Sequence, residues 1–565
     1  MKVSNLYPRN MAQPIAPDYG QQFLFPPALE DWVPKDHPVR FIREFVDQQD
    51  LAVLGFAMPI STEGRPPYAP GLLLKIWLYG YHHRLRSTRK LEAACRDQLP
   101  LLWLSGMIAP DHNSLWRFWR DNKKALRQLF KHSVQLALKA GLVGLVLQAV
   151  DGTKIQAAAS PHSGWSKEQM HKLLAALDRE LEEAEKQLEQ EGPIPEGSGY
   201  RLPARLEERQ ALRATVKAGL EQLEQDGRAH YHPKEPEARR MKCEGKRPFA
   251  YNAQAVVDQS HGVVVAAEVS MEEQDSSQLV AMVEQAQQNT GAASSVLTVA
   301  DGSYGSGAQV AAAAQRKLNV LVNPQEGGLR KDNGYSARDF PYDPKSGTVT
   351  CPQKRQLAFT GEGRQKGQTI KRYCCRAKDC PVAKLCQDRR GRRVIEIWSH
   401  TAAVQAMRER LAQVEPQQQL AKRGRIIERH FGQIKQHEGF RRWTVGGADN
   451  VRTQWALLNL INNLRVLYTH WSSRKQSSQP ARSRGVQCAP ICRSRAALPS
   501  LVLFPARFAQ RRFNQCFKQN LLRRSLLCRF GFGDFRAASG KDARIWFCVE
   551  IWDLGFGTCL SILRL

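Results

Sequence analysis

The stretch Gly144-Leu-Val-Leu-Gln-Ala-Val-Asp151-Gly-Thr-Lys154 decides the fold class of this 565-residue chain. It is a short apolar run that ends on a carboxylate followed by glycine. A second run, Val296-Leu-Thr-Val-Ala-Asp301-Gly, repeats the pattern further along. Short apolar runs bounded by turn residues are typical of buried strands. The sequence therefore predicts two buried strands, one at 144–157 that runs through Asp151 and one whose apolar run ends at Asp301.

The elements around these two runs alternate between strand and helix. Phe249–Asp258 and Val263–Val269 flank a Gly-containing turn, which predicts an antiparallel hairpin. Helices are expected at about 276–288 and 306–317, followed by a strand at 319–323. This order predicts an α/β fold, a mixed sheet flanked by helices. Carboxylates at strand ends lie where open α/β sheets place their sites.

Residues 1–140 have helical patterns, and the last helix begins near Pro110-Asp-His-Asn-Ser-Leu-Trp-Arg117. Asp111 or Asn113 is expected to cap that helix, and Ser87 is a candidate cap for the preceding one. Short helices joined by tight turns suit a helix-turn-helix whose last helix enters the DNA major groove. A helical bundle that only packs explains the pattern equally well.

Two insertions interrupt the predicted catalytic region at 141–470. The first, at about 160–246, reads as a helical hairpin that starts at a Ser166/Gln169 capping box. The second, at 325–398, is rich in Gly, Lys and Arg and is expected to be loop-rich. It supplies the candidate thiolate ligands for a structural Zn²⁺, which are Cys351, Cys375, Cys380 and Cys386. Reduced free cysteines are the alternative.

The net charge is +29, from 83 Lys and Arg against 54 Asp and Glu. Such an excess favours a polyanionic partner, usually nucleic acid. No apolar run reaches the roughly 20 residues of a membrane helix, and the N-terminus lacks the apolar stretch of a secretory signal. Thirteen cysteines, an odd number, argue against a disulfide framework. We expect a cytoplasmic protein without membrane partners.

Residues 471–565 differ in character from the rest of the chain. From residue 476 onward there are 13 Arg and 2 Lys against 4 acidic residues, a net +11, together with six of the thirteen cysteines. One interpretation of this segment is a basic arm that contacts DNA. The loss of hydrophobic periodicity favours a non-native extension, such as translation in a shifted frame, or a disordered tail. Without it the chain keeps +18.

A third acid, Glu428, lies in the basic helical segment Arg425-Ile-Ile-Glu-Arg-His-Phe-Gly-Gln-Ile-Lys435. Two carboxylates about 4 Å apart repel by roughly 4 kcal/mol at an effective dielectric of about 20. Two Mg²⁺ ions would relieve that repulsion and promote in-line displacement at a phosphodiester. Taken singly, each acid is better explained without a metal, Asp151 and Asp301 as turn residues and Glu428 as part of a surface ion pair. It is their joint occurrence in this topology and this basic chain that favours a metal site.

Together these segments resemble bacterial insertion-sequence transposases of the DDE type. The matching motifs are Val150-Asp-Gly-Thr-Lys154, Tyr251-Asn-Ala-Gln-Ala-Val-Val-Asp258, Val299-Ala-Asp-Gly-Ser-Tyr-Gly305 and Glu428-Arg-His-Phe-Gly-Gln-Ile-Lys435. Tyr68-Ala-Pro-Gly-Leu-Leu-Leu-Lys75 also looks like the helical domain that precedes the core in one branch. The resemblance covers about residues 20–470.

The resemblance implies an RNase H-like core in which Asp151, Asp301 and Glu428 bind two Mg²⁺ ions, with Mn²⁺ as a substitute. It implies double-stranded DNA as partner, both the inverted repeats of the element and the target, and a homodimer in the synaptic complex. The expected DNA contacts are Lys435, Arg423, Arg425, Arg441, Arg442 and Arg117. The family often has a tyrosine about eight residues before the glutamate, where this chain has Leu420.

Three functions follow from this pattern. The first is a transposase that cleaves at the ends of its element and transfers the freed strand to target DNA. The second is a structure-selective DNA nuclease without strand transfer. The third is a catalytically inactive DNA-binding remnant.

Overall fold

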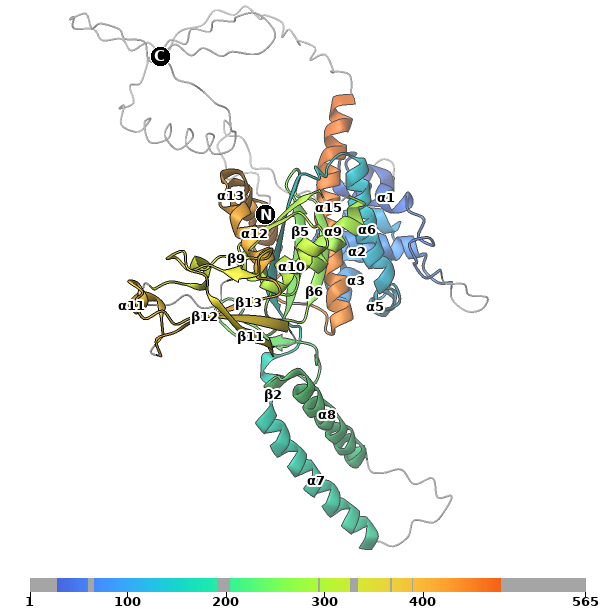
Figure 1. Cartoon of the computed structure of the whole chain (residues 1–565). Coiled ribbons are helices and arrows are strands. Elements are labelled where there is room, and N and C mark those ends of the chain that lie inside the picture. Colours follow the sequence, from blue (N-terminus) through green and yellow to red (C-terminus); the bar gives the residue numbers. More distant parts are fainter. Residues whose placement is uncertain are drawn as a thin grey trace, which may run out of the picture. The chain divides into compact units, whose positions relative to one another are not determined.

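The computed structural model describes residues 28–58, 66–190, 204–292, 295–325, 334–365, 368–388 and 390–478 (Figure 1). The tail predicted for residues 471–565 begins inside the last described helix, and the rest of it lies outside the described residues. No described helix combines the length and the apolar character that crossing a membrane requires.

A six-stranded mixed sheet forms the centre of the described chain. Its strands are β1 (Leu147–Gln156), β4 (Arg239–Arg240), β5 (Phe249–Asp258), β6 (Val264–Ser270), β7 (Leu297–Ala300) and β8 (Val320–Val322). The main order is β6-β5-β1-β7-β8, and β4 pairs with one end of β5. β5 is antiparallel to β1 and β6, whereas β7 and β8 run parallel to β1. This order confirms the predicted mixed sheet and fits an RNase H-like core.

The central strands are apolar because they are covered on both faces. Every residue of β5 is buried, and so are the first four residues of β1. β1 is longer than its apolar run, since its pairing with β5 continues to Gln156. Asp151 therefore lies inside a strand, which confirms the strand predicted at 144–157. It directly follows Val150, the last residue of β1 that pairs with the parallel strand β7.

Helices pack against this sheet. α9 (Leu279–Thr290) and α14 (Arg423–Gly432) both contact β1 and β5, while α15 (Ala448–Ser478) contacts β6. α10 (Gly307–Gln315) contacts α9 and α12 (Thr401–Leu411). The predicted helices and strands of this region are thus confirmed, with shifts of a few residues at their ends.

In the part of the chain that the structure describes, six helices precede the sheet. They are α1 (Pro38–Asp47), α2 (Pro70–His82), α3 (Thr88–Asp97), α4 (Leu99–Ser105), α5 (His112–Asp121) and α6 (Lys123–Lys139). Asp111 caps α5, because its carboxylate accepts the N–H groups of Asn113 and Ser114. Ser87 occupies the N-cap position of α3 but makes no side-chain cap hydrogen bond. The apolar side chains of these helices and of the sheet belong to one continuous core.

The first insertion is the predicted helical hairpin. α7 (Lys167–Gln190) and α8 (Ala204–Asp226) pack through their own small apolar core. The two-residue strands β2 (Trp165–Ser166) and β3 (His230–Tyr231) pair at its base. The capping box is present, since Ser166 and Gln169 each accept a backbone N–H from the other, at 3.2 and 2.9 Å.

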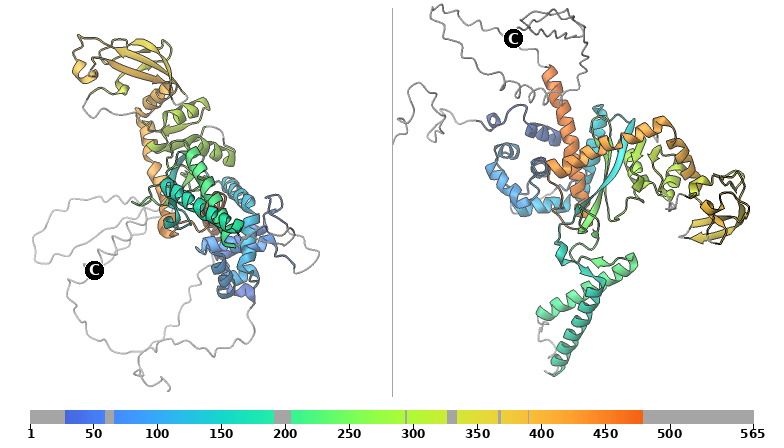
Figure 2. Two further views of the ribbon diagram at one scale, coloured as in Figure 1. Left: turned by 90° about the horizontal axis from the view of Figure 1, so that it is seen from below. Right: turned by 90° about the vertical axis from the view of Figure 1, so that its left-hand side faces the viewer.

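The second insertion is more ordered than the predicted loop-rich module. β11 (Ala358–Gln365), β12 (Gln368–Cys375) and β13 (Arg393–Trp398) form a three-stranded antiparallel sheet, visible as a small sheet of its own in Figure 2. The shorter elements are η5 (Ala337–Asp339), β9 (Tyr342–Asp343), β10 (Thr348–Val349) and α11 (Ala383–Cys386). Only alternate residues of β13 are well buried. The many Gly, Lys and Arg residues of the second insertion obscure this alternation of buried and exposed positions in the sequence.

Candidate functional site

Asp151 and Asp301 occupy equivalent places on neighbouring parallel strands. Val150 of β1 pairs with Ala300 of β7, and each of the two acids is the next residue along the chain. Their carboxylates therefore lie at the same level of the sheet, where β7 ends and β1 continues. Asp301 is the N-cap residue of the 3-10 turn Gly302–Tyr304, and its side chain is 54% exposed. The structure thus brings together two of the three predicted acids.

Arg423, the first residue of α14, lies between these carboxylates. One guanidinium nitrogen, Nη1, is 2.8 Å from Oδ2 of Asp151, and Nη2 is 3.9 Å from Oδ1 of Asp301. Arg423 was predicted to contact DNA, and here it bridges the two acids. Its side chain is 22% exposed, as is that of Asp151. A positive charge is therefore held where two negative charges meet.

Burial is the strongest influence on Asp151. It raises the pKa of Asp151 above the usual range of an aspartate, and the nearby charges of Asp301 and Asp275 act in the same direction. The backbone N–H of Gly152, which donates to Oδ1 at 2.7 Å, and the charge of Arg423 oppose this increase. The net direction shows that the site disfavours a bare carboxylate and gains from a nearby cation.

Glu428 lies one turn further along α14 and is exposed. Its carboxylate folds back along the helix toward Gly424, where a Cβ atom would lie 3.2 Å from Oε1. Within the described ranges, no group of three or more His, Cys, Asp or Glu side chains is arranged to hold a metal ion. Glu428 is therefore on a helix that packs against β1, but its carboxylate is not grouped with the other two.

A cleft of about 540 Å³ opens beside Asp301 and Arg423. Its other lining residues are Ala300, Asn323, Leu411, Gln417, Leu420, Ala421 and Gly424. Leu420, at the place where the family often has tyrosine, thus contributes to the wall of this cleft. The carboxylate of Asp301 is therefore open to solvent on the side of this cleft.

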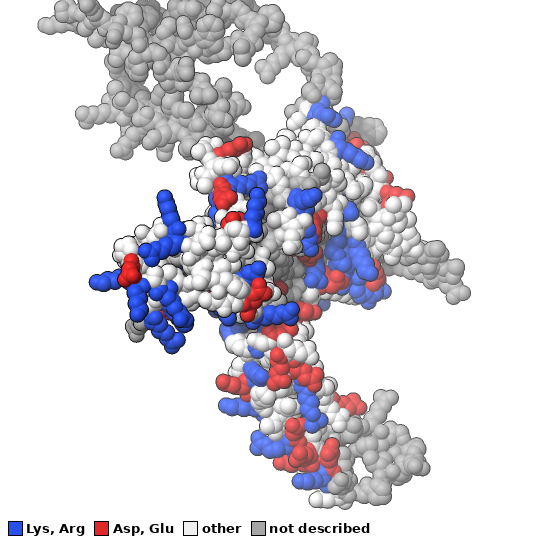
Figure 3. All heavy atoms as spheres, in the orientation of Figure 1, with Lys and Arg blue, Asp and Glu red and all other residues white. Residues whose placement is uncertain are grey.

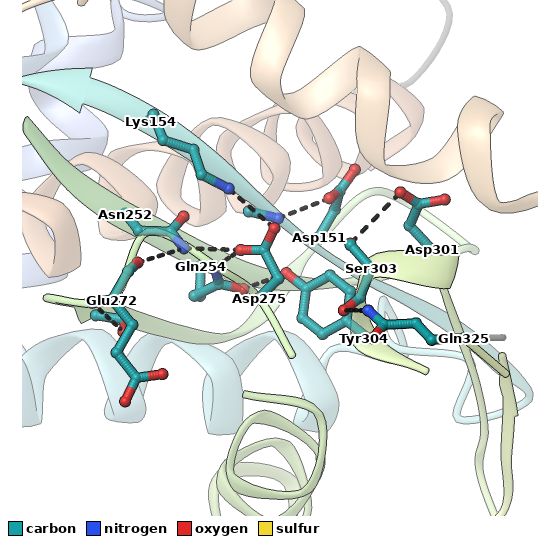
Figure 4. Close-up of polar contacts among 12 residues, drawn as sticks. Asp151, Lys154, Asn252, Gln254, Glu272, Asp275, Asp301, Ser303, Tyr304 and Gln325 are labelled. Atoms are coloured by element: carbon teal, nitrogen blue, oxygen red, sulfur yellow. Dashed lines mark hydrogen bonds and ion pairs between the residues drawn. The ribbon is translucent and has the colours of Figure 1, made fainter. Parts of the chain in front are cut away.

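A second polar network, not predicted from the sequence, lies next to Asp151 (Figure 4). Oδ2 of Asp275 accepts Nζ of Lys154 at 2.9 Å. Oδ1 of Asp275 accepts the side-chain amides of Asn252 and Gln254, at 2.7 and 2.8 Å. The hydroxyl of the buried Tyr304 donates to Gln254, which links this network to the turn after Asp301.

One sequence signal could have revealed this network. Asn252 and Gln254 are polar residues at alternate positions of a strand that is otherwise apolar apart from its last residue, Asp258, so they share one face of it. Fully buried polar side chains need hydrogen-bond partners. The partner Asp275 lies in a loop, 21 residues after Gln254, and the sequence alone does not indicate that pairing.

Two of the remaining predicted DNA contacts are engaged within the protein. The guanidinium of Arg442 donates to the backbone oxygens of Ala157, Ala158 and Ala159 and fastens the segment after α14 to the end of β1. Arg441 forms an ion pair with Glu244. Both arginines are nevertheless exposed, so their contacts with DNA stay a prediction.

Arg117 and Arg425 are exposed, and Lys435 is partly exposed in the π-helical turn Gln433–His437. Figure 3 shows Lys and Arg side chains projecting from the second insertion, whereas acidic and basic side chains alternate over the α7–α8 hairpin. The net positive charge is therefore unevenly distributed over the face shown.

The four candidate zinc ligands lie in the second insertion. Cys386 is buried in its small core, and Cys351 and Cys375 pack against that core. Burial raises the pKa of the Cys386 thiol, and the thiols of Cys380, Cys375 and Cys351 are close enough to raise it further. Among the described residues, no three or more His, Cys, Asp or Glu side chains are arranged to bind a metal ion, and this includes the four cysteines. The cysteines gather in one module without forming a tetrahedral site.

Comparison with known protein families gives two matches. A family described as Transposase domain (DUF772) matches residues 27–121, the region of the N-terminal helices up to α5. A family described as Transposase DDE domain matches residues 350–468, which include Arg423, Glu428 and Lys435. No curated protein compared with the chain matches it significantly.

Asp151 and Asp301 lie between the two matched segments, on the sheet against which α14 packs. The two family matches and the mixed α/β core together support an insertion-sequence transposase of the DDE type.

Proposed function

We propose that this transposase binds the inverted ends of its element, hydrolyses the strand at the element boundary and joins the freed 3′-hydroxyl to target DNA. The observation that carries the proposal is the placement of Asp151 and Asp301 at one level of two adjacent parallel strands. Glu428 is proposed as the third acid, because its helix α14 packs against β1.

The donor set suits Mg²⁺, a hard cation that binds carboxylate oxygens and retains several waters. Asp151 and Asp301 already share one cationic partner, Arg423, which supports a role for this pair in cation binding. When bound, divalent ions would supply electrophilic stabilisation of a phosphodiester and a more acidic water. The protein would contribute the position of the two carboxylates on the rigid sheet and the proximity of α14.

The proposed DNA contacts follow from charge and exposure. Arg117 and Arg425 are exposed, and Lys435 lies in the helical turn that follows α14. Residues 1–140 are proposed as the end-recognition region, with α5 presenting Arg117. Cleavage of two paired ends would be coordinated by a homodimer. Lowering the salt concentration should strengthen DNA binding, because phosphate neutralisation releases counterions.

The test uses the full chain and a labelled duplex that carries the inverted repeat flanking its coding region. Asp151→Asn, Asp301→Asn and Glu428→Gln should each retain end binding in a gel-shift assay and lose Mg²⁺-dependent nicking. Nicking that persists in Asp151→Asn or Asp301→Asn would refute the assignment. A pre-cut end with a free 3′-hydroxyl then distinguishes a transposase from a nuclease, because only a transposase joins it to target DNA.

A further inference from the structure

The guanidinium of Arg423 is divided between two carboxylates. Nη1 is directed to Asp151 and Nη2 to Asp301, at 2.8 and 3.9 Å. A planar guanidinium presents its N–H groups as a rigid fork, so one arginine can serve two acceptors at once. Because its side chain is largely buried, water screens these interactions only partly.

Arg423 and Glu428 lie on the same helix, α14. Arg423 begins α14, and Glu428 follows five residues later on the same helix. Five residues correspond to about 140° around the helix axis. One face of α14 therefore cannot present both side chains to the sheet. While Arg423 contacts Asp151, the carboxylate of Glu428 lies against Gly424 and is exposed.

We propose that Arg423 and a divalent cation compete for the carboxylates of Asp151 and Asp301, so that metal binding requires Arg423 to withdraw. This inference rests on the proposed function of the two acids. A cation coordinated by both carboxylates would lie within a few ångströms of the guanidinium, and like charges at that distance repel strongly. Arg423 is thus a positioning residue that sets the metal affinity of the site.

The helix that carries Arg423 and Glu428 is held on the sheet by other side chains. Ile427 and His430 of α14 are buried, and the helix contacts β1 and β5. We therefore expect the withdrawal to be a movement of the Arg423 side chain and not of the whole helix.

The test is a titration of the full-length protein with Mn²⁺ in the absence of DNA, with free Mn²⁺ followed by electron paramagnetic resonance. Arg423→Ala and Arg423→Gln should bind Mn²⁺ about tenfold more tightly than the wild type, because no ion pair has to be broken first. Arg423→Lys, which keeps the charge but loses the fork, should lie between them. Arg429→Ala removes the same charge from an exposed place on α14 and should change the affinity less than about twofold.

Equal or weaker Mn²⁺ binding by both Arg423→Ala and Arg423→Gln, each shown to be folded by circular dichroism, would overturn the inference. Asp151→Asn in the Arg423→Ala background separates this outcome from failure of the proposed function. If that substitution abolishes the tight binding, the two acids are the metal site and Arg423 competes there. If Asp151→Asn leaves the Mn²⁺ affinity unchanged both in the Arg423→Ala protein and in the otherwise wild-type protein, the proposed metal site itself is wrong.

Discussion

Lys154 and Asp275 form a largely buried ion pair beside Asp151, with side chains 21% and 11% exposed. The pair joins strand β1 to the loop before α9, and the two side-chain amides on Asp275 extend it to β5. Every oxygen of the Asp275 carboxylate therefore has a partner. This network fixes the strand that carries Asp151 relative to its neighbour.

Lys154→Met should lower the free energy of unfolding by about 2–3 kcal/mol, because it leaves the carboxylate of Asp275 buried without its cation. Urea denaturation followed by circular dichroism measures this loss. The matched control is Lys167→Met, which breaks the exposed pair with Glu224 and should cost less than about 0.5 kcal/mol. Equal losses in the two variants would show that the Lys154 pair contributes no more than a surface contact.

Gly152 allows the same network to approach β1. A Cβ atom at this position would lie 2.2 Å from Nε2 of Gln254 and 2.8 Å from Oδ1 of Asp275. We expect Gly152→Ala to destabilise the protein by about 1–3 kcal/mol, since the crowded groups must move apart. Gly432→Ala, at a helical glycine with open space around its Cβ position, should be neutral or stabilising by up to about 1 kcal/mol. Differential scanning calorimetry should show a lower melting temperature for Gly152→Ala and an unchanged or higher one for Gly432→Ala. An unchanged melting temperature in Gly152→Ala would contradict the prediction.

The fold could be predicted from the sequence wherever local pattern and burial agree. The apolar runs before Asp151 and Asp301 and the hairpin at 249–270 are buried on both faces, so their strands appear as continuous apolar segments. The α7–α8 hairpin was predictable because it packs mainly against itself. The small sheet of the second insertion was missed because it is mostly exposed, and its polar faces resemble a loop.

The candidate site was predictable only in part, for a different reason. The position of an acid after a strand is a local property, and Asp151 and Asp301 were identified in that way. The partners of those acids depend on contacts between distant segments. Arg423 lies 272 residues after Asp151, and no periodicity indicates that an arginine in a basic helix will contact a carboxylate on the sheet.

The cysteines of the second insertion remain a prediction of a structural zinc site. Because the described thiols do not form a ready tetrahedron, zinc would have to draw them together. We expect purified protein to contain about one zinc per chain and Cys386→Ser to lose it. Cys374→Ser should retain zinc, because adjacent strand residues point to opposite faces and Cys375 is the one that packs on the Cys386 core. Elemental analysis decides this, and protein free of zinc when grown with it would refute the site.

Arg86 connects the region of the N-terminal helices to the DDE region. Its Nη2 is 3.0 Å from Oε2 of Glu438, whose side chain is only 5% exposed, and its guanidinium lies over the ring of Phe440. Arg465 of α15 pairs with the other oxygen of the same carboxylate. One buried anion is therefore shared by two cations from distant parts of the chain.

Arg86→Ala should lower the free energy of unfolding by about 2–3 kcal/mol, since the buried Glu438 loses one of its two partners. Arg96→Ala, which breaks the pair between the exposed Arg96 and the partly buried Glu92, should cost less than about 0.5 kcal/mol. Chemical denaturation of both variants measures the difference. An Arg86 variant as stable as the Arg96 variant would mean that this buried pair does not stabilise the connection.

His82, at the end of α2, should make the stability of the protein depend on pH. Burial, assisted by the charge of Arg465, lowers the pKa of His82 from 6.5 to about 4. Between pH 6.5 and about 4 the unfolded chain binds a proton at this histidine that the folded chain does not bind. The free energy of unfolding therefore falls as the pH decreases through this range, and above pH 6.5 the contribution of His82 to that free energy is constant.

His82→Gln should reduce the slope of the free energy of unfolding against pH by up to about 1 kcal/mol per pH unit. Urea denaturation at intervals from pH 7.5 to 4.5 measures both slopes, and parallel curves for the variant and the wild type would contradict the prediction.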